Sequence, residues 1–103
     1  MLETFTASTF QPLVRECFRV HPGEAPPVEL ELLQVTLLTA SGPGWQTVPR
    51  RRDPFSLLFR GPQAPVLPQK IHRFEHPALG SFGLFIVPIR AGAEGTEYEA
   101  IFT

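Results

Sequence analysis

Twelve prolines and eight glycines cut this chain of 103 residues into short segments, and few uninterrupted stretches are long enough for an ordinary helix. Proline has no backbone N–H and disrupts a helix interior, so closely spaced prolines favour strands and turns. Within the segments, apolar residues recur at every second position, which is the pattern of a strand with one buried face. The sequence therefore predicts a mainly all-β fold.

Six segments carry the alternation and are predicted to be strands: 16–21, 28–38, 54–60, 70–76, 81–89 and 96–102. In 28–38 the apolar positions change parity after Leu32. A strand cannot change faces without an extra residue, so we predict a β-bulge near Leu32 and Leu33. Segment 81–89 is apolar on both parities, which predicts a central strand covered on both sides. Pro88 predicts loose pairing at its end.

The segment 7–14 is predicted to form one short helix, with Thr6 or Ser8 as its N-cap. The short connections favour an antiparallel meander, and no alternation of strands with helices is visible. A single short helix cannot cover a sheet this rich in Phe and Leu, so we expect a small barrel, roll or sandwich. In a sheet that is not closed, the strand at 16–21 or at 96–102 would be an exposed edge. The chain is expected to be one domain, 1–103, with a long loop at 40–53.

Composition excludes several classes of protein. The net charge of −1 gives no general attraction to nucleic acid or to acidic lipid, so we do not expect a nucleic-acid partner. Cys17 is the single cysteine, which rules out an internal disulfide. The acidic N-terminus does not resemble a secretory signal. The longest apolar run, 82–89, is far below the ~20 residues of a membrane-spanning helix. We therefore expect a cytoplasmic protein without a membrane partner.

His72 and His76 are the candidate polar site. On a helix this spacing could bind zinc, but on a strand it separates the two side chains by roughly 13 Å, too far for one ion. A metal site could still combine His76 with His21 or Glu16. The interpretation we favour is that His76 holds the following turn through its ring nitrogens.

No other motif predicts catalysis. Cys17 has no local nucleophile signature and is expected to be inert. The glutamates Glu29 and Glu31 share a strand face, as is typical of a solvated surface. The chain has no serine nucleophile elbow, phosphate loop or dinucleotide fingerprint. We predict no catalytic residue, no cofactor and no metal.

The long loop carries the only tryptophan, Trp45, followed by Arg50, Arg51 and Arg52. Three arginines can be a solvated surface. A tryptophan in a polar loop can also anchor a partner, with the arginines contacting an acidic surface. We predict that these four residues bind a protein partner.

Five motifs in the second half of the chain occur in a familiar order: PFSLLFRGP at 54–62, LPQ at 67–69, EHPALG at 75–80, LFIVPI at 84–89 and YEAIF at 98–102. They resemble a family of small bacterial domains of unknown function. The resemblance extends to an opening motif formed by Phe10, Leu13, Val14, Phe18 and Val20. It implies a glycine after the Leu-Val pair, where this chain has Arg15. It also implies a link with phage-tail-like assemblies, through neighbouring genes for phage-tail-collar-like proteins.

The hypothesis we favour is a non-catalytic structural or protein-interaction module, which binds a protein partner or associates with itself. One alternative is a small-molecule-binding β-barrel, which would enclose a pocket of about 300 Å³ or more. Another is a metal-dependent enzyme.

Overall fold

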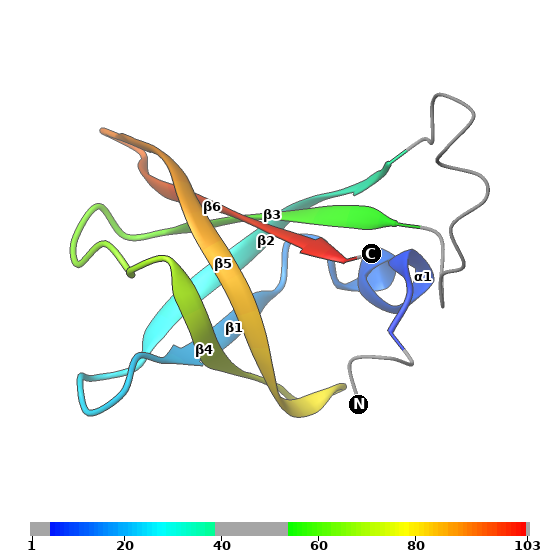
Figure 1. Ribbon diagram of the computed structural model, residues 1–103, viewed down its shortest axis with the longest axis horizontal. Coiled ribbons are helices and arrows are strands. Elements are labelled where there is room, and N and C mark those ends of the chain that lie inside the picture. Colours follow the sequence, from blue (N-terminus) through cyan, green and yellow to red (C-terminus); the bar gives the residue numbers. More distant parts are fainter. Residues whose placement is uncertain (1–4, 39–53, 103) are drawn as a thin grey trace.

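The computed structural model describes residues 5–38 and 54–102, and its strands close into a six-stranded antiparallel barrel (Figure 1). A helix, α1 (Ala7–Phe10), continues as the 3₁₀ helix η2 (Gln11–Leu13). The strands that follow are β1 (Cys17–His21), β2 (Val28–Leu37), β3 (Phe55–Gly61), β4 (Lys70–His76), β5 (Gly80–Gly92) and β6 (Gly95–Phe102). The predicted all-β fold with six strands and one short N-terminal helix is confirmed. Of the three architectures left open, the chain adopts the barrel.

The order of strands around the barrel is β1-β2-β3-β6-β5-β4, and β4 pairs with β1 to close it. The chain thus forms two three-stranded meanders, β1-β2-β3 and β4-β5-β6. The meanders join where β3 pairs with β6 rather than with β4, the next strand in sequence. Because β1 and β6 each pair on both sides, neither is the free edge expected for an open sheet.

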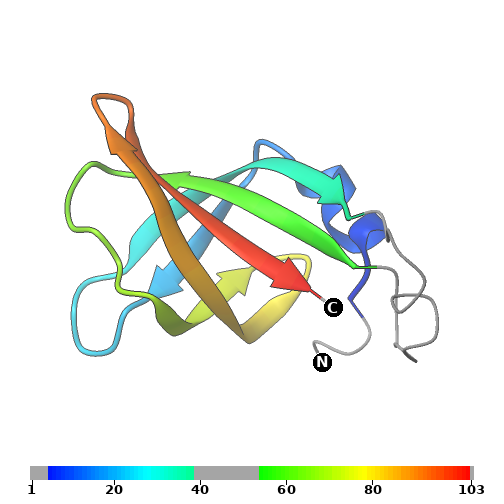
Figure 2. The same ribbon diagram turned by 45° about the horizontal axis from the view of Figure 1, so that its top comes forward.

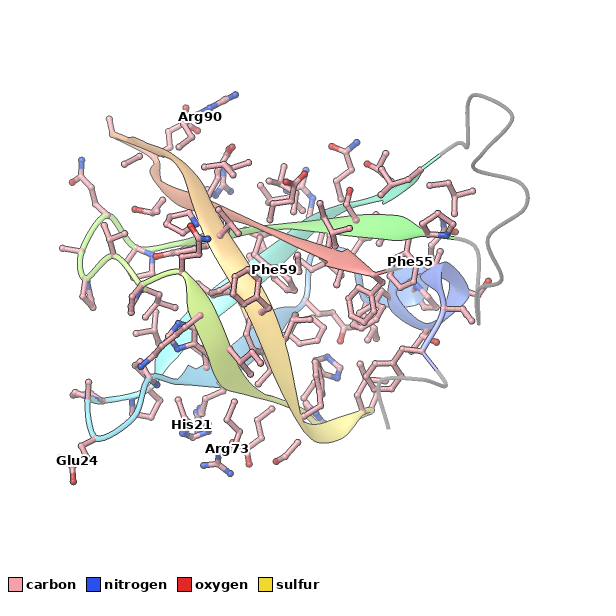
Figure 3. All side chains as sticks on the ribbon, in the orientation of Figure 1. His21, Glu24, Phe55, Phe59, Arg73 and Arg90 are labelled. Atoms are coloured by element: carbon pink, nitrogen blue, oxygen red, sulfur yellow. The ribbon has the colours of Figure 1, made fainter. Side chains whose placement is uncertain are left out.

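Over most of their length, the strands point alternate side chains into the barrel. In β1 these are Phe18 and Val20, as the alternation predicted. Figure 3 shows Phe55 and Phe59 of β3 within the barrel, and Phe10 of α1 contacts the Phe55 ring at one end. The largest fully buried side chains are Tyr98, Phe10, Phe18, Phe55, Phe59, Phe74, Leu30, Leu32, Leu57, Leu67, Ile86 and Val20. Neighbouring aromatic rings lie in contact, so the interior is filled by packed side chains.

The prediction that the strand at 81–89 is covered on both sides is wrong. Phe82, Leu84 and Ile86 of β5 point into the barrel, but Phe85 and Ile89 are each 48% exposed on its outer face. A closed barrel has one interior, and within the described residues no second layer covers the outside of β5. The predicted weakness at Pro88 is confirmed, because the β5–β6 register shifts between Pro88 and Arg90.

Two other local predictions depend on backbone chemistry. The predicted bulge is confirmed by a register shift between Leu32 and Gln34. The helix predicted over 7–14 is shorter than expected, because only Ala7–Phe10 is α-helical. Pro12 follows within one turn, and its ring would clash with the carbonyl four residues earlier. The chain therefore tightens into η2.

Arg15 has a backbone φ of +80°, in the left-handed region that favours glycine. It forms the link between η2 and β1, where its N–H donates to the Leu32 carbonyl at 2.7 Å. The resemblance implied a glycine at this position. The structure therefore requires here the conformation that glycine adopts most easily, although the chain has arginine.

We expect Arg15→Gly to leave the free energy of unfolding unchanged or raise it by up to about 1 kcal/mol. It removes a left-handed strain of about 1–2 kcal/mol and adds a smaller entropy to the unfolded chain. Arg15→Val should lower the free energy of unfolding by about 1–2 kcal/mol, because branched side chains tolerate this region least. Both variants lose the exposed Arg15–Glu31 ion pair, so its effect cancels between them. Urea unfolding of the two variants measures the difference, and a glycine variant less stable than the valine variant would contradict this explanation.

The β5–β6 hairpin rises above the neighbouring strands at one end of the barrel (Figure 2). The first residue after its turn is Gly95, at the start of β6, whose φ is +124°. A side chain on Gly95 would meet the backbone carbonyl oxygen of Gly61 in β3. The close approach of β3 to the turn of the hairpin therefore requires glycine at this position.

Candidate functional site

His76, at the end of β4, uses both ring nitrogens in contacts within the chain. Its Nδ1 accepts the Ala78 N–H at 3.0 Å, and its Nε2 lies 2.7 Å from Oε1 of Glu16. Since Nδ1 accepts, the ring proton is on Nε2 and is donated to the Glu16 carboxylate. The Phe18 ring lies against the imidazole, with 4.6 Å between ring centroids. These contacts fix the turn after β4, as the favoured interpretation of the sequence expected, and they join the turn to the segment that precedes β1.

His72 lies four residues before His76 on β4 and is also buried. Its Nε2 donates to the Pro68 carbonyl at 2.8 Å, because a carbonyl oxygen can only accept. The Nδ1 atom is buried and has no hydrogen-bond partner among the described residues. The two histidines of the candidate polar site therefore point to the same side of β4 but bind different groups.

A shallow groove of about 580 Å³ lies on the outside of the barrel. Its lining comes from β1, β2, β4 and the start of β5: Cys17, Arg19, Glu29, Glu75, His76, Pro77, Gly80 and Ser81. The register places Arg19 between Glu29 and Glu75 on the neighbouring strands. Arg19 forms an ion pair with Glu29 at 3.5 Å, and His21 lies 2.7 Å from Glu75.

Electrostatics in this groove do not favour a nucleophile. Partial burial raises the pKa of the Cys17 thiol, and the carboxylates of Glu29 and Glu31 raise it further. The reactive thiolate is therefore disfavoured. The hydrogen bond with His21 lowers the pKa of Glu75, and the positive charges of Arg73 and Arg19 act in the same direction. Glu75 is accordingly held as a carboxylate by its neighbours.

The histidine–glutamate contacts do not converge on one point. His76 pairs with Glu16, whereas His21 pairs with Glu75. Over residues 5–38 and 54–102, no three His, Cys, Asp or Glu side chains come together in a way that could hold a metal ion. No helix in this part of the chain is long and apolar enough to cross a membrane.

The four residues predicted to bind a partner, Trp45, Arg50, Arg51 and Arg52, lie outside the described residues. Their role stays a prediction.

A surface that the sequence interpretation missed lies on the outside of β4, β5 and β6. Ile71 of β4 is directly opposite Phe85 of β5. On β6, Ile101 lies two residues beyond Glu99, and the β5 partner of Glu99, Val87, lies two residues beyond Phe85. The three side chains are 67%, 48% and 57% exposed, and we name them the outer ridge. Apolar residues on both parities of 81–89 were the signal for this surface.

Comparison with known proteins finds one family model, described as a domain of unknown function (DUF6916), that matches residues 5–102. No curated protein and no solved structure matches the chain.

Proposed function

We propose that this chain, which belongs to the DUF6916 family of domains of unknown function, is a non-catalytic module that binds a partner protein through the outer ridge. The observation that carries the proposal is the exposure of Ile71, Phe85 and Ile101 on three adjacent strands. Single exposed apolar residues are ordinary on protein surfaces, whereas a contiguous exposed set is typical of a contact with another molecule.

The rest of the barrel supports this choice of surface. Its interior is occupied by packed aromatic rings, which favours binding on the outside over binding within. The outer groove has a volume in the range of ligand sites, but Arg19, Glu75 and His76 there bind other side chains of the chain. The small-molecule and metal-dependent alternatives therefore receive less support, and the link with phage-tail-like assemblies stays a prediction.

Site-specific photo-crosslinking tests the proposal. A photoreactive phenylalanine analogue placed at Phe85 is expected to give a discrete crosslinked product with another protein in cells of the source organism. The same analogue at Gln34, an exposed position on β2, is the control. The additional change Ile71→Ser should remove the product without lowering the melting temperature appreciably, because Ile71 is mostly exposed. Equal amounts of crosslinked product at positions 85 and 34, or no product at position 85, would refute the proposal. A product made of two copies of this chain would also overturn it, because the ridge would then bind a second copy and not a different protein.

A further inference from the structure

The turn after β4, formed by Pro77, Ala78 and Leu79, carries hydrogen bonds of two kinds. The Leu79 N–H donates to the backbone carbonyl of His76 at 3.1 Å. The Ala78 N–H donates to Nδ1 of the His76 ring at 3.0 Å. Only the bond from Ala78 depends on the charge of a side chain, because histidine can gain a proton near neutral pH and a backbone carbonyl cannot.

A neutral imidazole has one donor and one acceptor, and His76 uses both. Nδ1 accepts from Ala78, so the proton on Nε2 is donated to the Glu16 carboxylate, 2.7 Å away. A second proton can enter the ring only at Nδ1. Protonation therefore turns Nδ1 into a donor that faces the donor N–H of Ala78, and this hydrogen bond is lost. The bond to Glu16 is kept, because Nε2 donates in both charge states.

The surroundings of His76 offer the new proton no replacement for Ala78. His76 is only 5% exposed, and the Phe18 ring of β1 lies against its imidazole. The ionisable residues that line the outer groove with His76 are Cys17 and Arg19 of β1, Glu29 of β2 and Glu75 of β4. Arg19 pairs with Glu29, and Glu75 is bound to His21. In the described part of the chain Glu16 is the carboxylate in contact with the ring, and it lies at Nε2 and not at Nδ1.

We propose that His76 is a proton-operated latch for the turn after β4. Neutral His76 holds the Ala78 N–H. Protonated His76 releases it, while the contact with Glu16 keeps β4 joined to the segment before β1. The released N–H turns to water, which reorients the peptide between Pro77 and Ala78. Because Pro77 lines the outer groove, acidification changes the shape of the groove wall. The latch is independent of the outer ridge and of any partner bound there.

Nuclear magnetic resonance of the whole isotope-labelled chain, between about pH 8 and pH 5, tests the latch. Correlations between ring protons and ring nitrogens give the charge and tautomer of His76, and exchange with water gives the protection of each amide. At the alkaline end the ring proton should be on Nε2. As His76 becomes charged, the protection of the Ala78 amide, corrected for the intrinsic effect of pH, should fall about three- to tenfold, as expected for one hydrogen bond. The Leu79 amide is the internal control and should change less than about twofold, because its acceptor is a backbone carbonyl.

Two variants separate the latch from a general effect of acid. His76→Asn places a side-chain oxygen that does not titrate within reach of the Ala78 N–H, so the protection of Ala78 should no longer depend on pH. His21→Gln removes the other histidine between β1 and β4, and the response of Ala78 should remain, because His21 contacts Glu75 and not the turn.

The wild type alone decides the question if His76→Asn does not fold. A His76 ring that stays neutral down to about pH 5, an Ala78 amide that ignores the charge of the ring, or an equal loss of protection at Leu79 would each overturn the proposal. So would a response that persists in His76→Asn or disappears in His21→Gln.

Discussion

Replacing Phe82 with alanine is expected to lower the free energy of unfolding by about 3–5 kcal/mol, the usual cost of truncating a buried phenylalanine. Phe82 is only 6% exposed, and its ring contacts those of Phe5, Phe10 and Phe74. Truncation would remove apolar contacts and leave a cavity at the end of the barrel that α1 covers. Urea unfolding followed by circular dichroism measures the change.

The matched control is Phe85→Ala on the same strand. Phe85 points outward, so its truncation should cost less than about 1 kcal/mol. Where Phe82→Ala does not fold, Phe82→Leu keeps the comparison measurable, with an expected loss of about 1–2 kcal/mol. Equal losses at positions 82 and 85 would show that β5 does not separate an inner from an outer face.

Gly95→Ala should destabilise the barrel by about 2–5 kcal/mol. The φ of +124° would strain any residue with a Cβ by about 1–3 kcal/mol. The new methyl group would also meet the Gly61 carbonyl oxygen, which forces β3 and the hairpin apart at a further cost of about 1–3 kcal/mol. Thermal and urea unfolding of the variant measure the loss.

Gly92→Ala is the control for this second prediction. Gly92 is on the other strand of the same hairpin, and a Cβ there would meet no atom within 4 Å. Its replacement should change the free energy of unfolding by less than about 1 kcal/mol, and alanine can even stabilise by restricting the unfolded chain. An equal loss of unfolding free energy at Gly92 and Gly95 would contradict this explanation. It would show that replacing any glycine of this hairpin by alanine is costly, whether or not the new Cβ meets Gly61.

Alternation was sufficient to predict the strands and most of their inward faces because it is a local property of the backbone. The burial of Phe18 and Val20 and the bulge after Leu32 follow directly from the positions of apolar residues. The strand order could not be predicted in the same way. The pairing of β3 with β6 depends on how the whole sheet curls, and no short motif encodes it. The exposure of Phe85 was missed for the same reason, since periodicity does not say whether a second layer exists.

The candidate site shows a similar division. The strand spacing predicted that His72 and His76 are too far apart to share one ion, and the structure shows that they bind different groups. The turn predicted after His76 is present, and the His76 ring accepts a hydrogen bond from it. Glu16, the partner of His76, is 60 positions away in the sequence, so their contact could be found only from the three-dimensional structure.

The closure of the barrel between β1 and β4 has a consequence for synthesis on the ribosome. The contacts His21–Glu75 and Glu16–His76 join residues that are 54 and 60 positions apart. While the chain is being translated, β1, β2 and β3 are complete before the strands that cover their apolar faces exist. The nascent first meander therefore emerges with unshielded phenylalanines, and long-range pairing of this kind forms slowly.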